Sequence, residues 1–206
     1  MENQPQSIEK IIELKFANLA PGVWKALADL KRTGWVKRGV ENPESVQEHT
    51  ISLLKLASSF EDLSDTEKDG LLEMLEVHDW PEALHGDEAI ITKDPEERAR
   101  LKAIKFDKEH EALKTICGPL GVSGDKILNL WLRFEKSPDE AATFARQLDK
   151  YQAIEKAFEY EKSQGLLLFK KFYDGDIERI THPILVERLD DMMVEWKTLS
   201  INSSNK

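Results

Sequence analysis

The stretch that decides the fold is residues 45–60, which read SVQEHTISLLKLASSF. It opens with the pattern of a capping box, in which Ser45 accepts from the backbone N–H three residues on and Glu48 reaches back to the N–H of Ser45. Apolar side chains then recur at spacings of three and four from Leu53 to Phe60. This spacing places them on one face of a helix. The stretch therefore predicts an amphipathic helix that buries one side.

Similar start signals recur along the chain. Ser64 and Glu67 form a second capping-box pattern. The pairs Asp-Pro at 94–95 and Ser-Pro at 137–138 place a proline at the first helical position, where its missing N–H costs nothing. Helical periodicity follows each of these starts. We therefore predict helices after all of them.

Two more helices are expected at the ends of the chain. One covers residues 8–31, with a possible break at the Pro-Gly pair 21–22, and the last runs over about 183–199. Period-two alternation bounded by hairpin turns is absent from the sequence. We predict an all-α fold of six or more helices, forming a single domain over residues 1–206 with a core at about 31–161.

One segment departs from regular helical pattern. The pair Trp80-Pro81 should interrupt the helix that begins near Asp65, because proline lacks an N–H and clashes with the preceding turn. The polar, glycine-containing residues 82–87 follow, and we expect no regular helix there. Irregular polar segments beside a helix end commonly carry chemistry.

Composition narrows the function classes. The formal net charge of −10 opposes a nucleic acid polymer as partner, because a phosphate backbone would be repelled. The sequence has no apolar run near the ~20 residues of a membrane span and no signal-peptide pattern at its start. A single cysteine, Cys117, favours a reducing environment, so we expect a cytoplasmic protein with no membrane partner. The basic segment 31–38 supplies four cations for a small anionic substrate, although a solvated surface is its ordinary role.

Four residues suggest a metal site. His78 and Asp79 end an apolar helix, and His49 lies one turn into the helix after Ser45. Asp149 lies in a helix with a buried apolar face, where a carboxylate needs a cation or several donors. Two imidazoles and two carboxylates suit Mn, Co, Zn, Fe or Ni better than calcium.

Each of these residues also has an ordinary role. A lone histidine is commonly a surface or capping residue, and Asp149 could instead pair with Arg146 or Lys150. A rival metal motif is the Glu-x-x-His spacing of Glu82 and His85, as found in di-iron bundles. Those sites need a second such motif, and the sequence contains none.

The ordered set His49, His78-Asp79 and Asp149 resembles the H…HD…D pattern of the HD-domain metal-dependent phosphohydrolases. More specific pieces resemble the 5′-deoxynucleotidase branch of that family. They are residues 30–36 (LKRTGWV), 43–49 (PESVQEH), 78–87 (HDWPEALHGD) and 146–150 (RQLDK).

The resemblance implies a role for each matching position. His49, His78, Asp79 and Asp149 would ligate one divalent ion, which could be Mn, Co, Mg, Zn, Fe or Ni. Glu82 would position or deprotonate the attacking water, and Asp87 would contact the sugar or assist the leaving group. Arg32 would bind the phosphate, for which a guanidinium is well suited, and Trp35 would pack on the deoxyribose.

Two features depart from the family pattern. The residues after His49 lack the arginine that many relatives place about three positions on, and Trp80-Pro81 replaces a smaller or more flexible pair. Both leave the chemistry intact and the substrate open.

The resemblance predicts hydrolysis of a deoxyribonucleoside 5′-monophosphate to deoxynucleoside and phosphate, by a homodimer. Alternatives are hydrolysis of a cyclic nucleotide, an alarmone or a nucleoside triphosphate, or a non-catalytic helical module whose metal is structural. Glu82 favours an enzyme, because a structural metal needs no carboxylate beside open coordination positions. Only one compact basic segment, residues 31–38, is visible in the sequence, and this favours a monophosphate. Base preference, native metal and oligomeric state stay open.

Overall fold

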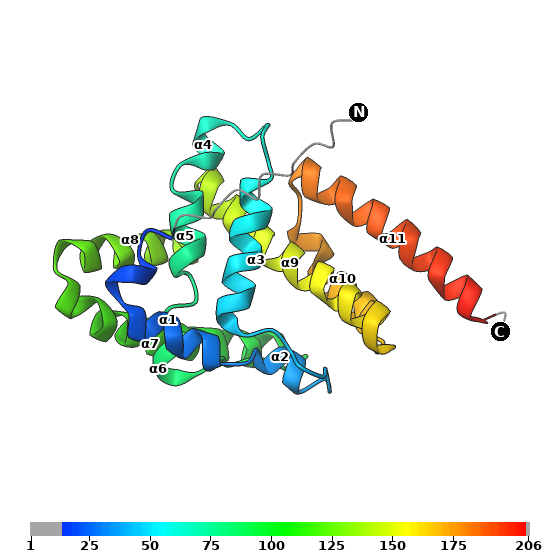
Figure 1. The fold of residues 1–206 in the computed structure, drawn as a ribbon, viewed down its shortest axis with the longest axis horizontal. Helices are drawn as coiled ribbons and strands as arrows, with labels where there is room; N and C mark the ends of the chain where they lie inside the picture. Colours follow the sequence, from blue (N-terminus) through cyan, green and yellow to red (C-terminus); the bar gives the residue numbers. More distant parts are fainter. Residues whose placement is uncertain (1–13, 205–206) are drawn as a thin grey trace, which may run out of the picture.

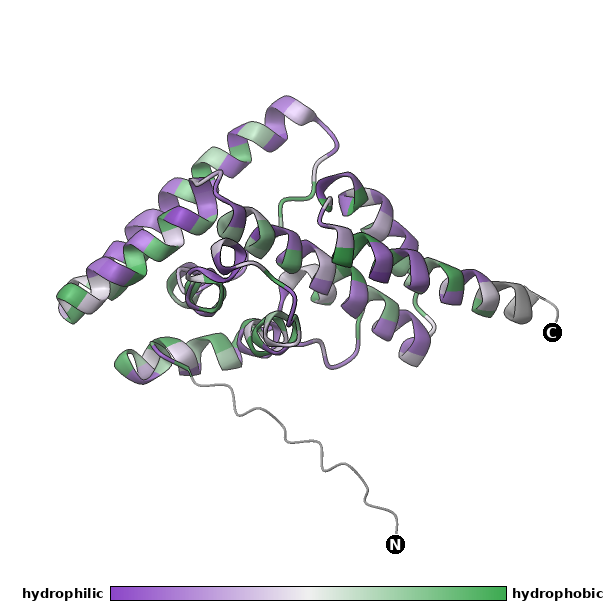
Figure 2. Cartoon of the chain, turned by 90° about the horizontal axis from the view of Figure 1, so that it is seen from above, coloured by the Kyte–Doolittle hydropathy of each residue, from purple (hydrophilic) through white to green (hydrophobic). Residues whose placement is uncertain are grey.

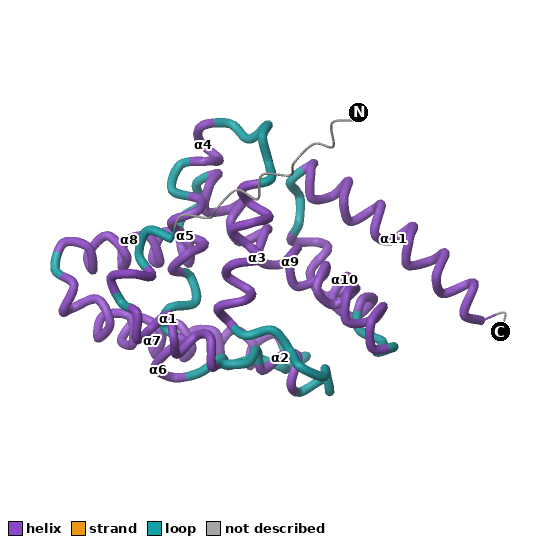
Figure 3. Tube along the Cα trace, in the orientation of Figure 1, coloured by secondary structure: helices purple, strands orange, loops and turns teal. Residues whose placement is uncertain are grey.

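The computed structural model describes residues 14–204, and within that range the chain is all-α (Figures 1 and 3). The one pairing of strand type among these residues is an isolated bridge between Lys31 and Ser45. The elements in chain order are η1 (Ala17–Leu19), α1 (Pro21–Asp29), α2 (Thr33–Val36), α3 (Val46–Ser58), α4 (Asp65–Lys68), α5 (Leu71–Val77), α6 (Glu82–His85), α7 (Pro95–Cys117), η2 (Gly118–Leu120), α8 (Val122–Lys136), α9 (Glu140–Gln164), α10 (Phe169–Asp176), η3 (Ile177–Arg179) and α11 (Pro183–Ser204).

Three predicted helix starts are confirmed. Both hydrogen bonds of the capping box are formed at Ser45 of α3 and again at Ser64 of α4. Asp94 caps α7 by accepting from two backbone N–H groups, and Pro95 follows it at the first helical position. Each cap satisfies N–H groups that the first turn of a helix leaves unpaired, which is worth about 1 kcal/mol.

Three expectations need correction. The helix that begins at Asp65 ends after one turn, because Gly70 adopts a left-handed φ of 69° before α5. The predicted start at 137–138 lies two residues later, because the Asp139 side chain accepts from the Ala142 N–H. Residues 82–85 form the helical turn α6, since Pro81 at φ −54° is compatible with a helix start.

The terminal helices also differ from their predicted bounds. In the described part of the predicted 8–31 helix, the chain forms η1 and then α1, which begins at the expected break at Pro21. Residues 8–13 lie outside the described range. The last helix, α11, begins at Pro183 as expected and continues to Ser204. None of the helices among the described residues is both long and apolar enough to cross a membrane.

The core forms around α9, which contacts α3, α5, α8 and α10 (Figure 1). Leu53 of α3, Leu75 of α5 and Leu148 of α9 are fully buried in one apolar cluster. Figure 2 shows that hydrophilic residues are interspersed with hydrophobic ones along the long helices, as expected when only one face of each helix packs inward. Because α3, α5 and α9 all contact one another, polar side chains on their facing sides are forced together.

Candidate active site

Three of the four predicted metal ligands come together where α3 meets the end of α5. His49, His78 and Asp79 each offer one donor atom, and these atoms all lie within 4.8 Å of one another. His78 Nε2 lies 3.1 Å and His49 Nε2 lies 3.8 Å from Asp79 Oδ2. Both imidazoles are buried, with 0% and 5% of His49 and His78 exposed.

The hydrogen bonds of the two Nδ1 atoms determine which ring nitrogen of each histidine faces the site. His78 Nδ1 lies 2.8 Å from the carbonyl oxygen of Leu75, so this nitrogen carries the proton and donates it. His49 Nδ1 lies 2.7 Å from Gln152 Oε1 and can donate in the same way. Both Nε2 atoms then present a lone pair to the site.

These lone pairs indicate that the site suits a cation. Neither His49 Nε2 nor His78 Nε2 has a hydrogen-bond partner within the described part of the chain, although both are buried. A buried polar atom without a partner costs free energy, and a metal ion would relieve this cost at both rings. Burial works to raise the pKa of Asp79, but the histidines and Arg32 hold that pKa well below its usual range. The donor set thus fits a divalent metal with two imidazole nitrogens and an ionised carboxylate.

Asp149 approaches the same point from α9 but has a second partner. Its Oδ1 lies 3.2 Å from His49 Nε2, while its Oδ2 lies 2.6 Å from Lys150 Nζ. The ion pair weighed as an alternative from the sequence is therefore formed, and Asp149 lies outside the tight group of three donors. Its role as fourth ligand stays a prediction.

Arg32 lies behind the His49 ring. Its Nη1 is 2.6 Å from His49 Nδ1 and 3.8 Å from Glu44 Oε1. When Nδ1 donates to Gln152, it cannot also accept from Arg32, so the guanidinium keeps donors for another acceptor. Arg32 also lines a cavity beside the site, where a phosphoryl oxygen could take that place.

Trp35 is a buried residue with 2% exposure. Its ring stacks on Phe172 at 4.6 Å between centroids, and its Nε1 donates to Glu44 Oε1 at 3.0 Å. Glu44 in turn accepts from Gln152 Nε2 at 3.2 Å, so Trp35 is connected to the amide that orients His49. Packing on a deoxyribose stays a prediction for this residue.

The sequence interpretation missed Glu44 and Gln152. The only signal in the sequence is weak: Gln152 follows Asp149 by three positions, which places both on one side of α9. The contact between Gln152 and His49 spans 103 residues, and no local pattern reports such a contact.

Glu82 lies on α6 and is 5% exposed. Burial raises the pKa of this carboxyl well above its ordinary value, and the negative charge of Asp79 raises it further. Lys105 Nζ, 3.4 Å from Glu82 Oε1, opposes both effects. A buried carboxyl with a raised pKa beside a candidate metal site is typical of a general base.

Asp87 connects this segment to α2. Its Oδ2 accepts from the backbone N–H of Thr33 at 2.6 Å, and its carbonyl oxygen accepts from the Thr33 hydroxyl at 2.8 Å. Because Thr33 follows Arg32 directly, Asp87 also fixes the backbone beside the predicted phosphate ligand. Its predicted contact with the sugar or the leaving group stays open.

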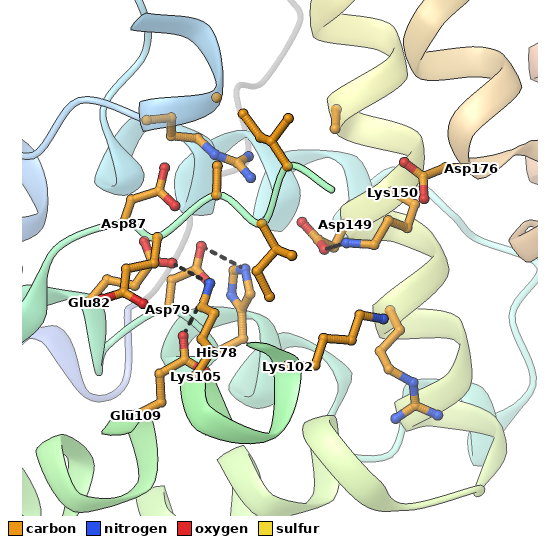
Figure 4. A pocket seen from close by; sticks show the side chains of 18 of the residues that line it. His78, Asp79, Glu82, Asp87, Lys102, Lys105, Glu109, Asp149, Lys150 and Asp176 are labelled. Carbon is orange, nitrogen blue, oxygen red and sulfur yellow. Dashed lines mark hydrogen bonds and ion pairs between the residues drawn. The ribbon is translucent and has the colours of Figure 1, made fainter. Parts of the chain in front are cut away.

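A cavity of about 640 Å³ opens beside these residues, within the usual ~300–1,000 Å³ of ligand sites. Figure 4 shows Glu82, Asp87 and Glu109 on one side of it and Lys102 and Lys150 on the other. We name the two sides by their lining residues. The acidic wall is Glu82, Asp87, Glu109 and Glu135, and the basic wall is Arg98, Lys102, Lys150 and Arg179, with Asp149 and Asp176 on the same side as these cations.

The basic wall was also missed by sequence interpretation. It is assembled from α7, α9 and η3, so its cations are spread over 82 positions of the chain, from residue 98 to residue 179. Residues 31–38 stay the one compact basic segment that the sequence shows, but the cavity also receives cations from other parts of the chain. Of the four cations in that segment, Arg32 and Arg38 line the cavity.

The rival metal motif gains no support. His85 is absent from the donor group formed by His49, His78 and Asp79 in the described part of the chain. Both of its ring nitrogens are buried without a hydrogen-bond partner among the described residues.

Comparison with known proteins places this geometry in a family. The family model described as HD domain matches residues 25–184. A mouse protein named 5′-deoxynucleotidase HDDC2 is 34% identical over 173 residues, which cover 82% of each chain. A budding yeast protein, 5′-deoxynucleotidase YGK1 from Saccharomyces cerevisiae, is 28% identical over 91% of each chain. The crystal structure of the PH0347 protein from Pyrococcus horikoshii matches with a TM-score of 0.60 and 25% identity, over 86% of this chain and 96% of that one.

Proposed function

The chain belongs to the HD domain family, and we propose that it is a metal-dependent 5′-deoxynucleotidase, which hydrolyses deoxyribonucleoside 5′-monophosphates to a deoxynucleoside and phosphate. One observation carries the proposal. The donor atoms of His49, His78 and Asp79 converge beside a cavity that also receives the buried carboxyl of Glu82. The names of the relatives point to the same reaction.

We propose that His49, His78, Asp79 and Asp149 hold one divalent ion, of Mn, Co, Mg, Zn, Fe or Ni. When bound, such an ion supplies Lewis-acid polarisation of a phosphoryl oxygen and lowers the pKa of a water molecule. Gln152 and the Leu75 carbonyl keep the two imidazoles turned with Nε2 toward the ion. Lys150 would share Asp149 with it.

The remaining steps belong to side chains of the chain itself. Glu82 accepts the proton of the attacking water as the oxygen of that water bonds to phosphorus, the bond from phosphorus to O5′ breaks, and the departing O5′ takes up a proton from solvent. Its raised pKa suits this task, because a base works best when its pKa is near the operating pH. Arg32 holds a phosphoryl oxygen, and its charge stabilises the transition state.

Glu82 also favours an enzyme over a module whose metal is only structural. Burying a carboxyl that neither caps a helix nor ligates the metal is unfavourable. A module without catalysis would gain nothing from keeping it 5% exposed beside the site. A hydrolysis in which a proton must be accepted beside the metal site gives the Glu82 carboxyl a function.

The test is a phosphate-release screen with Mn, Co and Mg. It compares deoxyribonucleoside and ribonucleoside monophosphates with diphosphates, triphosphates and cyclic nucleotides. We expect the deoxyribonucleoside 5′-monophosphates to be the best substrates, and a Glu82→Gln preparation serves as the control for contaminating phosphatases. Faster hydrolysis of a cyclic nucleotide or a triphosphate would replace this function with one of its alternatives.

Some further properties are proposed with the function. We infer one domain, because residues from Phe16 to Leu189 share a single apolar cluster. We also propose a cytoplasmic homodimer that binds neither nucleic acid polymers nor membranes. The oligomeric state can be checked by light scattering coupled to size-exclusion chromatography.

A further inference from the structure

Glu44 is a buried carboxylate to which the proposed mechanism gives no task. It lies directly before Ser45, the N-cap of α3, and is 5% exposed. Its Oε1 accepts from Trp35 Nε1 at 3.0 Å, and its Oε2 accepts from Gln152 Nε2 at 3.2 Å. Arg32 Nη1 lies 3.8 Å from Oε1 and supplies the opposite charge. Burying a carboxylate is unfavourable unless it is paired and hydrogen-bonded, and both oxygens of Glu44 are used in this way.

The Gln152 side chain links Glu44 to His49, and the carboxylate decides how this amide is oriented. An amide has one end that donates and one end that accepts, whereas a carboxylate only accepts. The NH₂ end of Gln152 must therefore face Glu44, and its Oε1 lies 2.7 Å from His49 Nδ1. Nδ1 must carry the ring proton to donate to this oxygen, so Nε2 keeps the lone pair that a metal ligand needs.

Other neighbours of His49 favour the opposite tautomer. Arg32 Nη1, 2.6 Å from Nδ1, would donate to that nitrogen if it carried no proton. Asp149 Oδ1, 3.2 Å from Nε2, would accept from a proton placed there. In that tautomer Nε2 has no lone pair to offer a metal. Among the polar contacts of this ring in the described part of the chain, only the contact with Gln152 favours a proton on Nδ1, and Glu44 keeps that amide from turning over.

We propose that Glu44 is a positioning residue, which selects the metal-binding tautomer of His49 through the Gln152 amide. The inference rests on the proposed function, since it takes His49 as a metal ligand. Without the carboxylate, Gln152 can present its NH₂ end to Nδ1, and the ring then carries its proton on Nε2. The same selection leaves the Arg32 guanidinium available for a phosphoryl oxygen, because Nδ1 cannot accept from it.

The first test is Glu44→Gln, which keeps the shape of the side chain and removes its charge. The oxygen of the new amide accepts from Trp35, so its NH₂ end faces Gln152 and turns that amide over. We expect the affinity for Co²⁺, titrated against a competing chelator, to fall about 10–100-fold. Tyr160→Phe is the matched control, because it removes the 2.8 Å hydrogen bond of the Glu44 backbone N–H and leaves the carboxylate in place. Its affinity should be unchanged.

The second test exchanges the two side chains in the double variant Glu44→Gln/Gln152→Glu. Position 152 then offers His49 Nδ1 only an acceptor, and the amide at position 44 can donate to it. We expect the Co²⁺ affinity to return to within about threefold of wild type, as a double-mutant cycle measures. Loss of a merely structural hydrogen bond would not be repaired by a second change beside it. The double variant also decides the question if Glu44→Gln alone does not fold.

Nitrogen-15 NMR of the histidine rings reads the tautomer directly, in the full chain freed of metal by a chelator. At about pH 8 an imidazole with an ordinary pKa of about 6.5 carries one proton, and the spectrum shows which nitrogen holds it. We expect the proton of His49 on Nδ1 in the wild type and the double variant, and on Nε2 in Glu44→Gln.

Two results would overturn the proposal. One is that the His49 tautomer and the Co²⁺ affinity are the same in Glu44→Gln as in the wild type. The other is that the double variant binds Co²⁺ as weakly as Glu44→Gln. Failure of the proposed metal site is a separate result, in which the wild-type chain binds no metal. The NMR comparison then still decides whether Glu44 sets the tautomer.

Discussion

The acidic and basic walls face the same cavity, but only the acidic wall contains buried residues, Glu82 and Glu109, beside the half-buried Asp87 and the exposed Glu135. Glu82 and Glu109 of the acidic wall are 5% and 9% exposed, whereas the side chains of Lys150 and Arg179 on the basic wall are 37% and 48% exposed. Burial shifts proton affinity strongly, while exposed charges are screened by water and salt. The buried glutamates of the acidic wall are therefore suited to proton transfer and the basic wall to reversible binding of an anion.

Helix α7 supplies residues to both walls. Arg98, Lys102, Lys105 and Glu109 follow one another along it at spacings of three and four, and all line the cavity. The sign of the charge changes along this stripe from basic to acidic. Lys105 lies at the change, with its Nζ 3.4 Å from Glu82 Oε1 and 3.2 Å from Glu109 Oε1. The comparison predicts that changes on the acidic wall alter kcat and changes on the basic wall alter binding.

The largest effect is expected at the proposed metal ligands, because both catalysis and phosphate binding depend on them. His78→Ala and Asp149→Ala should each lose bound metal and with it nearly all turnover, because each removes a proposed ligand. Elemental analysis of protein prepared without chelator measures the metal directly. His85→Ala is the matched control and should keep its metal, since His85 lies outside the donor group. Full metal occupancy in both ligand variants would contradict the assigned site.

The next largest effect tests the chemistry of the acidic wall. Glu82→Gln should lower kcat at least about a hundredfold while metal content is unchanged, because general base catalysis contributes ~10²–10⁴-fold. Steady-state kinetics with parallel metal analysis gives the result. If turnover stays near normal with metal bound, Glu82 is not the base and Asp87 becomes the leading candidate.

A smaller effect is expected at Lys105, which positions Glu82 without contacting substrate. Lys105→Met should lower kcat about tenfold and leave KM nearly unchanged, since only the base is misplaced. The pH profile should also move to higher pH, because loss of this cation raises the pKa of Glu82. Lys108→Met, whose lysine pairs with Glu88 on the surface, is the control. If only KM changed, Lys105 would act in binding, as the basic wall does, and not in positioning Glu82.

The smallest effect concerns stability and pH. Burial raises the pKa of Glu109 to about 7, although the charge of Lys105 opposes the rise. The folded protein therefore binds this proton more tightly than the unfolded chain, so the stabilisation is complete below the ordinary carboxyl pKa and is lost as pH rises through 7. At pH 9, Glu109→Gln should raise the melting temperature above that of the wild type, by about 2–4 °C for each kcal/mol gained in the free energy of unfolding. At pH 5 the substitution should have little effect. Equal shifts at both pH values would show that titration of Glu109 is not the cause.

The sequence predicted those features of the fold that depend on local hydrogen bonds. The capping boxes at Ser45 and Ser64 join groups three residues apart, and the cap at Asp94 is equally local. Such bonds form in almost any packing environment, so the pattern alone is sufficient. The later start of α9 was missed because Asp139 competes with Ser137, and Arg133 holds the Asp139 carboxylate from the preceding helix at 2.9 Å.

By itself, the sequence determined the all-α class and, through its resemblance to a family, the residue types that meet at the metal site. Tertiary structure alone decided how those residues are oriented and what surrounds them. The Gln152 amide that turns His49 lies 103 residues along the chain from it. The basic wall draws its cations from α7, α9 and η3, and no part of the chain contains all of them. The physical reason is that helix caps and amphipathic faces arise from neighbours in sequence, whereas the field within a cavity is the sum of charges that only packing brings together.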